Sequence, residues 1–154
     1  DVFLGAMGQA FFSLSLGMGC LSTSNNVALG GHVIVGDHAI LGGQSAAHQF
    51  VRIGAYAMVG GAAGVLQDVP PFVMAHLNPA KAAGLNLVGL RRAGFTDEQL
   101  RALRKAYGHF YREQLTVKEA VPLIEALKSD YPGASDALQL FIDFVTTTQR
   151  GCVR

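Results

Sequence analysis

Three histidines lie in one short stretch of this 154-residue sequence: His32, His38 and His48. An imidazole ring can remove a proton from a substrate near neutral pH, or it can bind a metal ion such as zinc. Cys20 and Cys152 stand near opposite ends of the chain, which argues against a disulfide framework and a cysteine-based metal knuckle. The elements that carry the three histidines therefore decide which chemistry is possible.

A repeat of six residues sets those elements, and it is the strongest periodic signal in the chain. The first member of each hexad is apolar: Leu29, Val35, Leu41, Ala47, Ile53, Val59 and Val65. A small or aliphatic residue follows four positions later: Val33, Ala39, Ser45, Val51, Ala57, Ala63 and Val69. Glycine follows the first member in most hexads: Gly30, Gly36, Gly42, Gly54 and Gly60. Seven consecutive matches predict a solenoid of hexapeptide repeats.

Each hexad can form one short strand and a turn, so three hexads close a triangular coil. The apolar residue then points into the prism and stacks on its copies, while glycine relieves crowding where the chain bends. His48 and Gln49 stand where the repeat has given up its turn glycine, which favours a role in a cleft over an ordinary polar turn. His32 and His38 are one hexad apart on adjacent faces, which argues against a shared metal ion, and a solvated turn is expected for His38.

The regular repeat has a limit at each end. Leu16 and Leu29, each followed by glycine, are thirteen positions apart instead of twelve, which predicts one extra residue near Cys20–Ser24. Pro70 and Pro71 are expected to end the β-helix, because proline has no N–H to donate to a ladder.

The last third of the chain changes to helical spacing. Thr96 and Gln99 have the spacing of a capping box and predict a helix, and Thr116 and Glu119 predict a second one. A third helix is expected over residues 135–148. The predicted organisation is a β-helix over residues 1–71, an extended linker over residues 72–94 and a helical domain over residues 95–154.

Composition narrows the possible partners. The net charge of +1 gives no support to a nucleic-acid-binding function. Charged residues are absent between Asp1 and Asp37, but the stretch is interrupted by glycine and polar residues, so we expect no membrane span and no signal segment. These residues are Gly5, Gly8, Gly17, Gly19, Gln9, Ser13 and Ser15. Two cysteines indicate a reducing compartment. The chain begins without methionine, and we expect it to be a fragment.

Several motifs are more specific than the hexads. They are Asn25-Asn26-Val27-Ala28-Leu29-Gly30-Gly31-His32-Val33, His48-Gln49-Phe50, Asn78-Pro79, and Gly84-Leu85-Asn86-Leu87-Val88-Gly89-Leu90-Arg91-Arg92. Together with the helical tail they resemble the C-terminal part of the bacterial acyl-[acyl-carrier-protein]–UDP-N-acetylglucosamine O-acyltransferases, over about residues 25–154. The resemblance implies a β-solenoid plus α fold, namely a left-handed parallel β-helix followed by a helical C-terminal domain.

The resemblance also implies an enzyme activity. A 3-hydroxyacyl chain would pass from acyl carrier protein to the 3-hydroxyl of UDP-N-acetylglucosamine, the first step of lipid A biosynthesis. The enzyme would be a cytoplasmic homotrimer with clefts between neighbouring β-helices, and it would need no metal and no cofactor. Matched by motif, the catalytic residues are Gly31 and His48, and the substrate-binding residues are His32, Gln49, Gly61, Asn86 and Arg92.

Each matched residue has an implied task. The backbone N–H of Gly31 would stabilise the oxyanion formed from the thioester. His32 would lie in the nucleotide-sugar cleft, and Gly61 would leave the acyl groove open to a longer chain. Asn86 and Arg92 would bind the nucleotide diphosphate, since a guanidinium fork suits phosphate oxygens.

The chain departs from the family pattern at positions that matter. The family's general base falls on Ser13, or on Phe12 in the shifted register, and no histidine precedes His32. Val88 and Ala93 replace a carboxylate and an arginine of the family. Two alternatives therefore stay open: a catalytically inactive trimeric β-helix scaffold, and a trimeric metal hydrase that uses three histidines on the same fold, which the helical tail does not fit.

Overall fold

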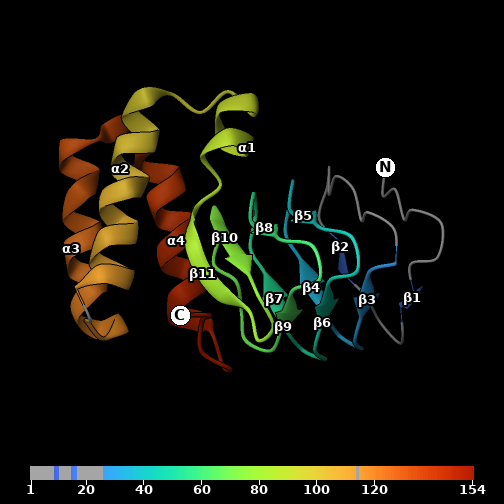
Figure 1. The fold of residues 1–154 in the computed structure, drawn as a ribbon. Helices are drawn as coiled ribbons and strands as arrows, with labels where there is room; N and C mark the ends of the chain where they lie inside the picture. The colour runs from blue at the N-terminus through green and yellow to red at the C-terminus, as the bar shows by residue number, and fades with distance from the viewer. Residues whose placement is uncertain (1–8, 11–14, 17–25, 114) are drawn as a thin grey trace. The chain divides into compact units, whose positions relative to one another are not determined.

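The computed structural model describes residues 9–10, 15–16, 26–113 and 115–154 (Figure 1). The chain divides into two compact units, which are described separately below. The first comprises residues 1–86 and 149–154, and the second comprises residues 87–148.

The first unit is a parallel β-helix made of very short strands (Figure 1). Parallel pairing places these strands on three sheets, two with the orders β1-β3-β6-β9 and β2-β4-β7, and a third that contains the pair β5–β8. The two-residue strands are β1 (Gln9–Ala10), β2 (Ser15–Leu16), β3 (Ala28–Leu29), β4 (Ile34–Val35), β5 (Ile40–Leu41), β6 (Ala46–Ala47), β7 (Arg52–Ile53), β8 (Met58–Val59) and β9 (Gly64–Val65).

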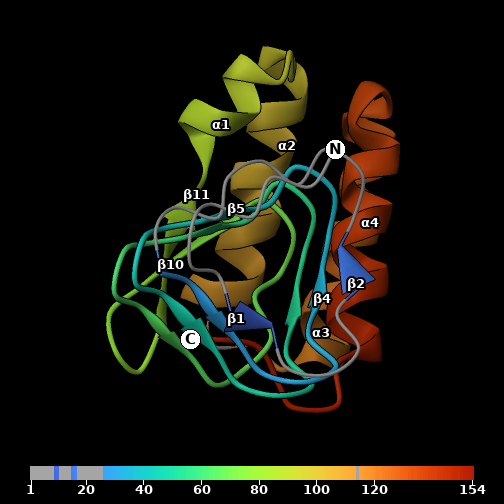
Figure 2. The same cartoon turned by 90° about the vertical axis from the view of Figure 1, so that its right-hand side faces the viewer.

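The register shows that three hexads make one coil. Ala28 pairs with Ala46 and Ile40 pairs with Met58, so each coil contains 18 residues. Figure 2 looks along the stack, where the strands lie on the sides of the coil and the turns lie at its corners. The predicted triangular coil is therefore confirmed.

Upstream, the register confirms the extra residue. Gln9 pairs with Ala28 and Ser15 pairs with Ile34, which are separations of 19 residues. The additional residue consequently lies between β2 and β3. The segment predicted to hold it, Cys20–Ser24, is outside the residues that the structure describes.

The core of the β-helix follows the hexad pattern. In the strands from β3 to β9 the second residue is buried, and its neighbour is more exposed. Every small or aliphatic residue four positions further on is buried as well. The turns require a left-handed backbone, with a positive φ at non-glycine residues such as His38 and Tyr56. His38 is exposed as expected, and its ring stacks on that of Tyr56, with centroids 4.8 Å apart.

The segment expected to be an extended linker is folded. Strand β10 (Val73–His76) pairs in parallel with β8, and β11 (Lys81–Leu85) pairs antiparallel with β10. Pro70 and Pro71 do not end the β-helix. They lie in the turn between the Ile53–Val69 bridge and β10, where the ladder needs no N–H from proline.

The C-terminal segment returns to the β-helix. The amide of Asp68 donates to the carbonyl of Gly151 at 3.0 Å, and the amide of Val153 donates to the carbonyl of Asp68 at 2.9 Å. Cys152 and Val153 are buried. This strand-like contact could not be predicted from the sequence, because it joins residues more than eighty positions apart.

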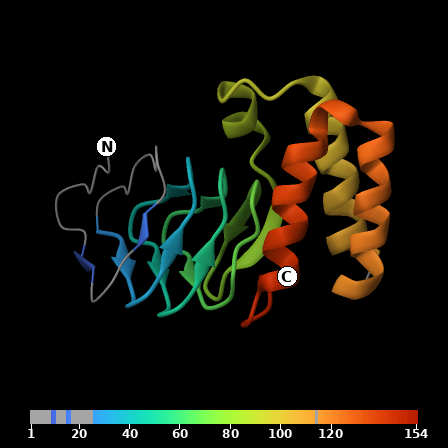
Figure 3. The same cartoon turned by 180° about the vertical axis from the view of Figure 1, so that it is seen from behind.

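The second unit is helical and matches the predicted periodicity. It contains α1 (Leu87–Arg92), α2 (Asp97–Tyr107), a π-helical turn over Gly108–Arg112, α3 (Val117–Asp130), a 3-10 turn over Pro132–Ala134 and α4 (Ser135–Thr147). Figure 3 shows α2, α3 and α4 side by side. Their buried faces include Leu100, Leu103, Ile124, Leu138 and Phe141. No described helix is long and apolar enough to cross a membrane.

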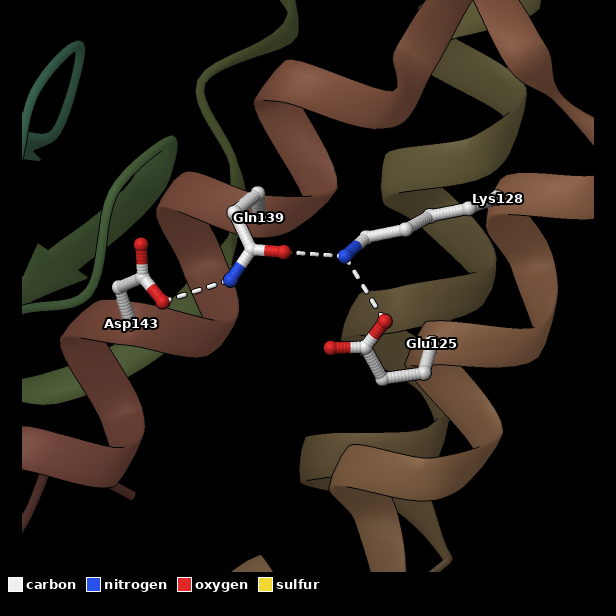
Figure 4. Close-up of polar contacts among 4 residues, drawn as sticks. All are labelled: Glu125, Lys128, Gln139 and Asp143. Atoms are coloured by element: carbon white, nitrogen blue, oxygen red, sulfur yellow. Dashed lines mark hydrogen bonds and ion pairs between the residues drawn. The ribbon is translucent and has the colours of Figure 1, made fainter.

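A polar network joins α3 to α4 on the surface (Figure 4). Lys128 Nζ lies 2.8 Å from a carboxylate oxygen of Glu125 and also donates to the side-chain oxygen of Gln139. The amide nitrogen of Gln139 donates to Asp143 at 2.6 Å. Such exposed networks contribute little to stability, so the apolar face holds the helices together.

Both predicted capping boxes are present. Thr96 and Gln99 exchange hydrogen bonds at the start of α2, and Thr116 and Glu119 do so at the start of α3. The hydrogen bond from the backbone of Thr116, reinforced by its hydroxyl, holds the pKa of Glu119 below its ordinary value. A carboxyl group whose folded-state pKa is lowered stabilises the fold above its unfolded-state pKa, and this contribution is lost as the pH falls through the folded-state value.

Glu119→Gln is therefore expected to weaken the acid sensitivity of folding. Glutamine can still accept the hydrogen bonds of Thr116, but it does not titrate. The urea midpoint should fall less between pH 7 and about pH 3 in this variant than in the parent chain. Asp130→Asn, at the other end of α3, removes the same charge and is the matched control for the loss of one carboxylate. Equal acid sensitivity in Glu119→Gln and the parent would contradict this role.

Candidate functional site

The 18-residue coil brings four predicted site residues to one corner of the β-helix. The turn over residues 30–32 contains Gly31 and His32, and the turn over residues 48–50, which contains His48 and Gln49, stacks directly on it. Two backbone hydrogen bonds join them, from Gly30 N to the carbonyl of Ala47 at 2.8 Å and from Phe50 N to the carbonyl of Gly31 at 2.9 Å. These two turns are called the histidine corner below.

Gly30 allows the two turns to approach so closely. A Cβ atom at this position would lie 2.5 Å from the backbone nitrogen of Gln49 and 2.9 Å from its Cα. Both are backbone atoms, so no side-chain movement could relieve the clash. The glycine of the hexad thus places the Gly31–His32 turn beneath the His48–Gln49 turn.

His32 is held by a ring stack. Its backbone has a φ of 59°, and its imidazole lies 4.8 Å from the ring of Phe50, with an interplanar angle of 14°. Phe50 itself is 52% exposed and has a φ of 65°. The stack uses the face of the imidazole, so the nitrogen edge of His32 stays available for hydrogen bonds. The motif His48-Gln49-Phe50 did not by itself predict this supporting role of Phe50.

Gly31 offers a backbone donor. Its carbonyl accepts from Phe50, whereas its N–H has no acceptor among residues 26–113 and 115–154 or the described strands before them. The turns at the other two corners use the same pattern, since the carbonyls of Asp37 and Gly43 also accept from the following coil. An N–H left unused in this way can stabilise a developing oxyanion.

His48 and Gln49 are joined by a residue from the far end of the chain. The guanidinium of Arg150 donates to the carbonyl of Gln49 at 3.2 Å, and its other terminal nitrogen lies 3.4 Å from Nδ1 of His48. His48 Nδ1 also lies 3.1 Å from the Gln49 carbonyl. Arg150 was not identified from the sequence, because 102 positions separate it from His48.

Gly61 lies at a different corner. Its turn stacks on the turn over residues 42–44, through a 2.9 Å hydrogen bond from Ala62 N to the carbonyl of Gly43. A Cβ at position 61 would meet that carbonyl oxygen at 3.3 Å, with nothing else nearby. Within one chain, Gly61 is therefore not part of the histidine corner.

The two residues predicted to bind a nucleotide diphosphate belong to different units. Asn86 ends the first unit and is buried; its amide nitrogen donates to the carbonyl of Tyr56 at 3.0 Å, and its backbone N–H donates to Phe72 at 2.7 Å. Arg92 is exposed at the end of α1 in the second unit. Asn86 thus fixes the last coil, whatever else it contacts.

The described residues show no metal centre. Across those parts of the chain, no three histidine, cysteine, aspartate or glutamate side chains lie together as ligands. His32 and His38 stack on different aromatic rings at separate corners. Ser13 and Phe12, where the family's general base would fall, are outside the described residues.

Comparison with known proteins identifies the family of this chain. Residues 68–153 match the family model described as UDP N-acetylglucosamine O-acyltransferase, domain 2. The chain belongs to the UDP-N-acetylglucosamine O-acyltransferase family. An acyl-[acyl-carrier-protein]–UDP-N-acetylglucosamine O-acyltransferase from Burkholderia mallei is 45% identical over 131 residues, which are 85% of this chain and 50% of the relative. This member of the family thus spans about half the length of the curated relatives it matches.

Solved structures of the family have the same fold. A UDP-N-acetylglucosamine O-acyltransferase from Moraxella catarrhalis is 44% identical, with a TM-score of 0.78 over 84% of this chain and 49% of the other. An enzyme of the same name from Bacteroides fragilis is 31% identical, with a TM-score of 0.78 over 92% of this chain and 51% of the other. The predicted fold class, a left-handed parallel β-helix followed by helices, is confirmed.

Proposed function

We propose that this chain takes part in the transfer of a 3-hydroxyacyl group from acyl carrier protein to the 3-hydroxyl of UDP-N-acetylglucosamine, the first step of lipid A biosynthesis. The observation that carries the proposal is the histidine corner. It collects Gly31, His32, His48 and Gln49 from two successive coils, in a chain whose relatives are named for this reaction.

The chemistry fits the groups at this corner. The sugar hydroxyl attacks the thioester carbonyl, the C–O bond forms, and the C–S bond then breaks to release the carrier thiol with a proton. The carbonyl oxygen becomes negatively charged in between, and the unused N–H of Gly31 can donate to it. His32, held against Phe50, offers its nitrogen edge to the nucleotide sugar. No step requires a metal or a cofactor.

The position of Gly61 supports a homotrimer. Gly61 is proposed to line the acyl groove, yet it lies at another corner of the prism than His32 and His48. A cleft between two neighbouring chains would bring the histidine corner of one chain to the Gly61 corner of the next, so we propose three chains with clefts between their β-helices. Acyl carrier protein would present the thioester to such a cleft from outside. Both proposed substrates are cytoplasmic, and we propose that compartment for the chain.

Arg92 and Asn86 are the residues proposed for binding the nucleotide diphosphate. Arg92 is exposed and carries the planar fork that suits phosphate oxygens. The contribution of Asn86 is less direct, because its amide nitrogen donates to the carbonyl of Tyr56. We propose that Asn86 fixes the end of the last coil for the ligand, while Arg92 contacts the phosphates.

A transfer assay tests the proposal, with the 154-residue chain, a 3-hydroxyacyl carrier protein and UDP-N-acetylglucosamine. Ser13→His supplies a histidine where the motif match places the family's general base and should raise the rate by about 100-fold, the lower end of what a positioned general base contributes. Acylated UDP-sugar is measured by mass spectrometry. Ser13→Asn is the matched control, because it adds a polar side chain that is no base.

A catalytically inactive trimeric scaffold is the second candidate. The observation in its favour is that no histidine precedes His32 in this sequence. If Ser13→His folds and forms trimers but yields no more acylated product than Ser13→Asn, the acyl-transfer proposal fails and the scaffold stands. Size-exclusion chromatography with light scattering supplies the check on assembly.

A further inference from the structure

Arg150 is fixed beside the histidine corner by its own segment. The backbone carbonyl of Arg150 accepts a hydrogen bond from Gln67 Nε2 at 3.3 Å. The next residue, Gly151, accepts from the amide of Asp68 at 3.0 Å, and Val153 donates back to Asp68 at 2.9 Å. Cys152, between them, is buried. The backbone of this arginine and the residues that follow it are therefore held by one turn of the β-helix.

The guanidinium of Arg150 bridges two adjacent residues. One terminal nitrogen donates to the carbonyl of Gln49 at 3.2 Å, and the other lies 3.4 Å from Nδ1 of His48. A guanidinium has five donors and no acceptor, and it keeps its charge at all ordinary pH values. The contact with His48 is a hydrogen bond only if Nδ1 is the acceptor.

We propose that Arg150 is a positioning residue that holds His48 in the tautomer with its proton on Nε2. The competing contact supports the assignment. Nδ1 of His48 also lies 3.1 Å from the Gln49 carbonyl, which would favour a proton on Nδ1. Arg150 donates to that same carbonyl and presents a positive charge to Nδ1, so it satisfies the acceptor and disfavours the Nδ1–H form.

The tautomer decides what His48 can do. With its proton on Nε2 and Nδ1 occupied by Arg150, the neutral ring is a hydrogen-bond donor and not a general base. Its Nε2–H has no acceptor among the residues that the structure describes. The next step rests on the proposed function. The Nε2–H group of His48 would donate to an oxygen of the acyl thioester or of the UDP-sugar. The proton of the sugar hydroxyl must then go to another group.

Ring-nitrogen NMR of the 154-residue chain tests the proposal without requiring turnover. The chain is labelled with ¹⁵N-histidine, and long-range ¹H–¹⁵N spectra are recorded at about pH 8.5, where an ordinary imidazole is neutral. The signals of His48 are assigned by their loss in His48→Gln. Arg150→Gln removes the charge and the fork, and Arg101→Gln on α2 is the matched control for the loss of one exposed arginine.

The parent chain should show His48 with a protonated Nε2. In Arg150→Gln the ratio of the Nε2–H to the Nδ1–H form should fall roughly fivefold, since Nδ1–H can then donate to the Gln49 carbonyl. Arg101→Gln should match the parent. A parental ratio in Arg150→Gln, or an Nδ1–H form in the parent, overturns the proposal. Because the readout needs no turnover, a chain inactive in the transfer assay can still show the Arg150 effect.

Discussion

Gly42→Ala is expected to destabilise the β-helix by about 3 kcal/mol, although it adds one methyl group. A Cβ at this position would lie 2.5 Å from the backbone nitrogen of Gly61 and 2.7 Å from the carbonyl carbon of Gly60. These atoms belong to the next coil, which is tied to Gly42 by the 2.7 Å hydrogen bond from its amide to the Val59 carbonyl. The clash can be relieved only by separating two coils. Urea unfolding followed by circular dichroism measures the loss.

The matched control is Gly108→Ala in the helical unit. Gly108 follows α2 with a φ of −58°, and a Cβ there would have nothing within 4 Å. Alanine should therefore stabilise the chain by roughly 0.5–1 kcal/mol, because it restricts the unfolded chain without strain. The same substitution is thus expected to have opposite signs in the two units. Equal urea midpoints for the two variants would show that the neighbouring coil does not exclude a side chain at position 42.

The repeat was sufficient to predict the β-helix, because the period of six determines both the strands and the coil. Each inward residue is buried only through its copies in neighbouring coils, so local sequence and tertiary packing carry the same information. The prediction that Pro70 and Pro71 end the β-helix was wrong for a physical reason. A proline breaks a ladder only where its missing N–H is needed, and these two lie in a turn. The β10–β11 hairpin beyond them lacks the hexad period, so its sequence predicts a linker and not strands.

Four of the site residues could be predicted as neighbours once the coil length was known. Residues 30–32 and 48–50 are one coil apart, so Gly31 and His32 must meet His48 and Gln49. The motifs alone could not show that Gly61 occupies another corner, nor that Asn86 is buried against Tyr56. The hexapeptide period could not predict the contact between Arg150 and His48. Arg150 reaches His48 only because the chain leaves the β-helix, forms four helices and returns.

Phe141→Ala is expected to cost about 3–5 kcal/mol, the largest stability effect predicted for this chain. Phe141 of α4 is 1% exposed and meets Phe110 edge to face, with centroids 5.5 Å apart at 87°. Truncation removes the buried ring, leaves a cavity between the helices and abolishes the aromatic contact. The loss should appear as a lower midpoint in urea, with an unchanged slope if unfolding stays two-state.

Leu140→Ala is the control from the same turn of α4. Leu140 is 42% exposed, so its truncation should change stability by no more than about 0.5 kcal/mol. The double variant Phe110→Ala, Phe141→Ala should lose less unfolding free energy than the two single variants lose together, by roughly 0.5–1.5 kcal/mol. The reason is that each single variant already removes the contact between the two rings. If Phe141→Ala proved as mild as Leu140→Ala, α4 would not be anchored by this ring. The apolar spacing that predicted the helix would then describe a surface and not a core.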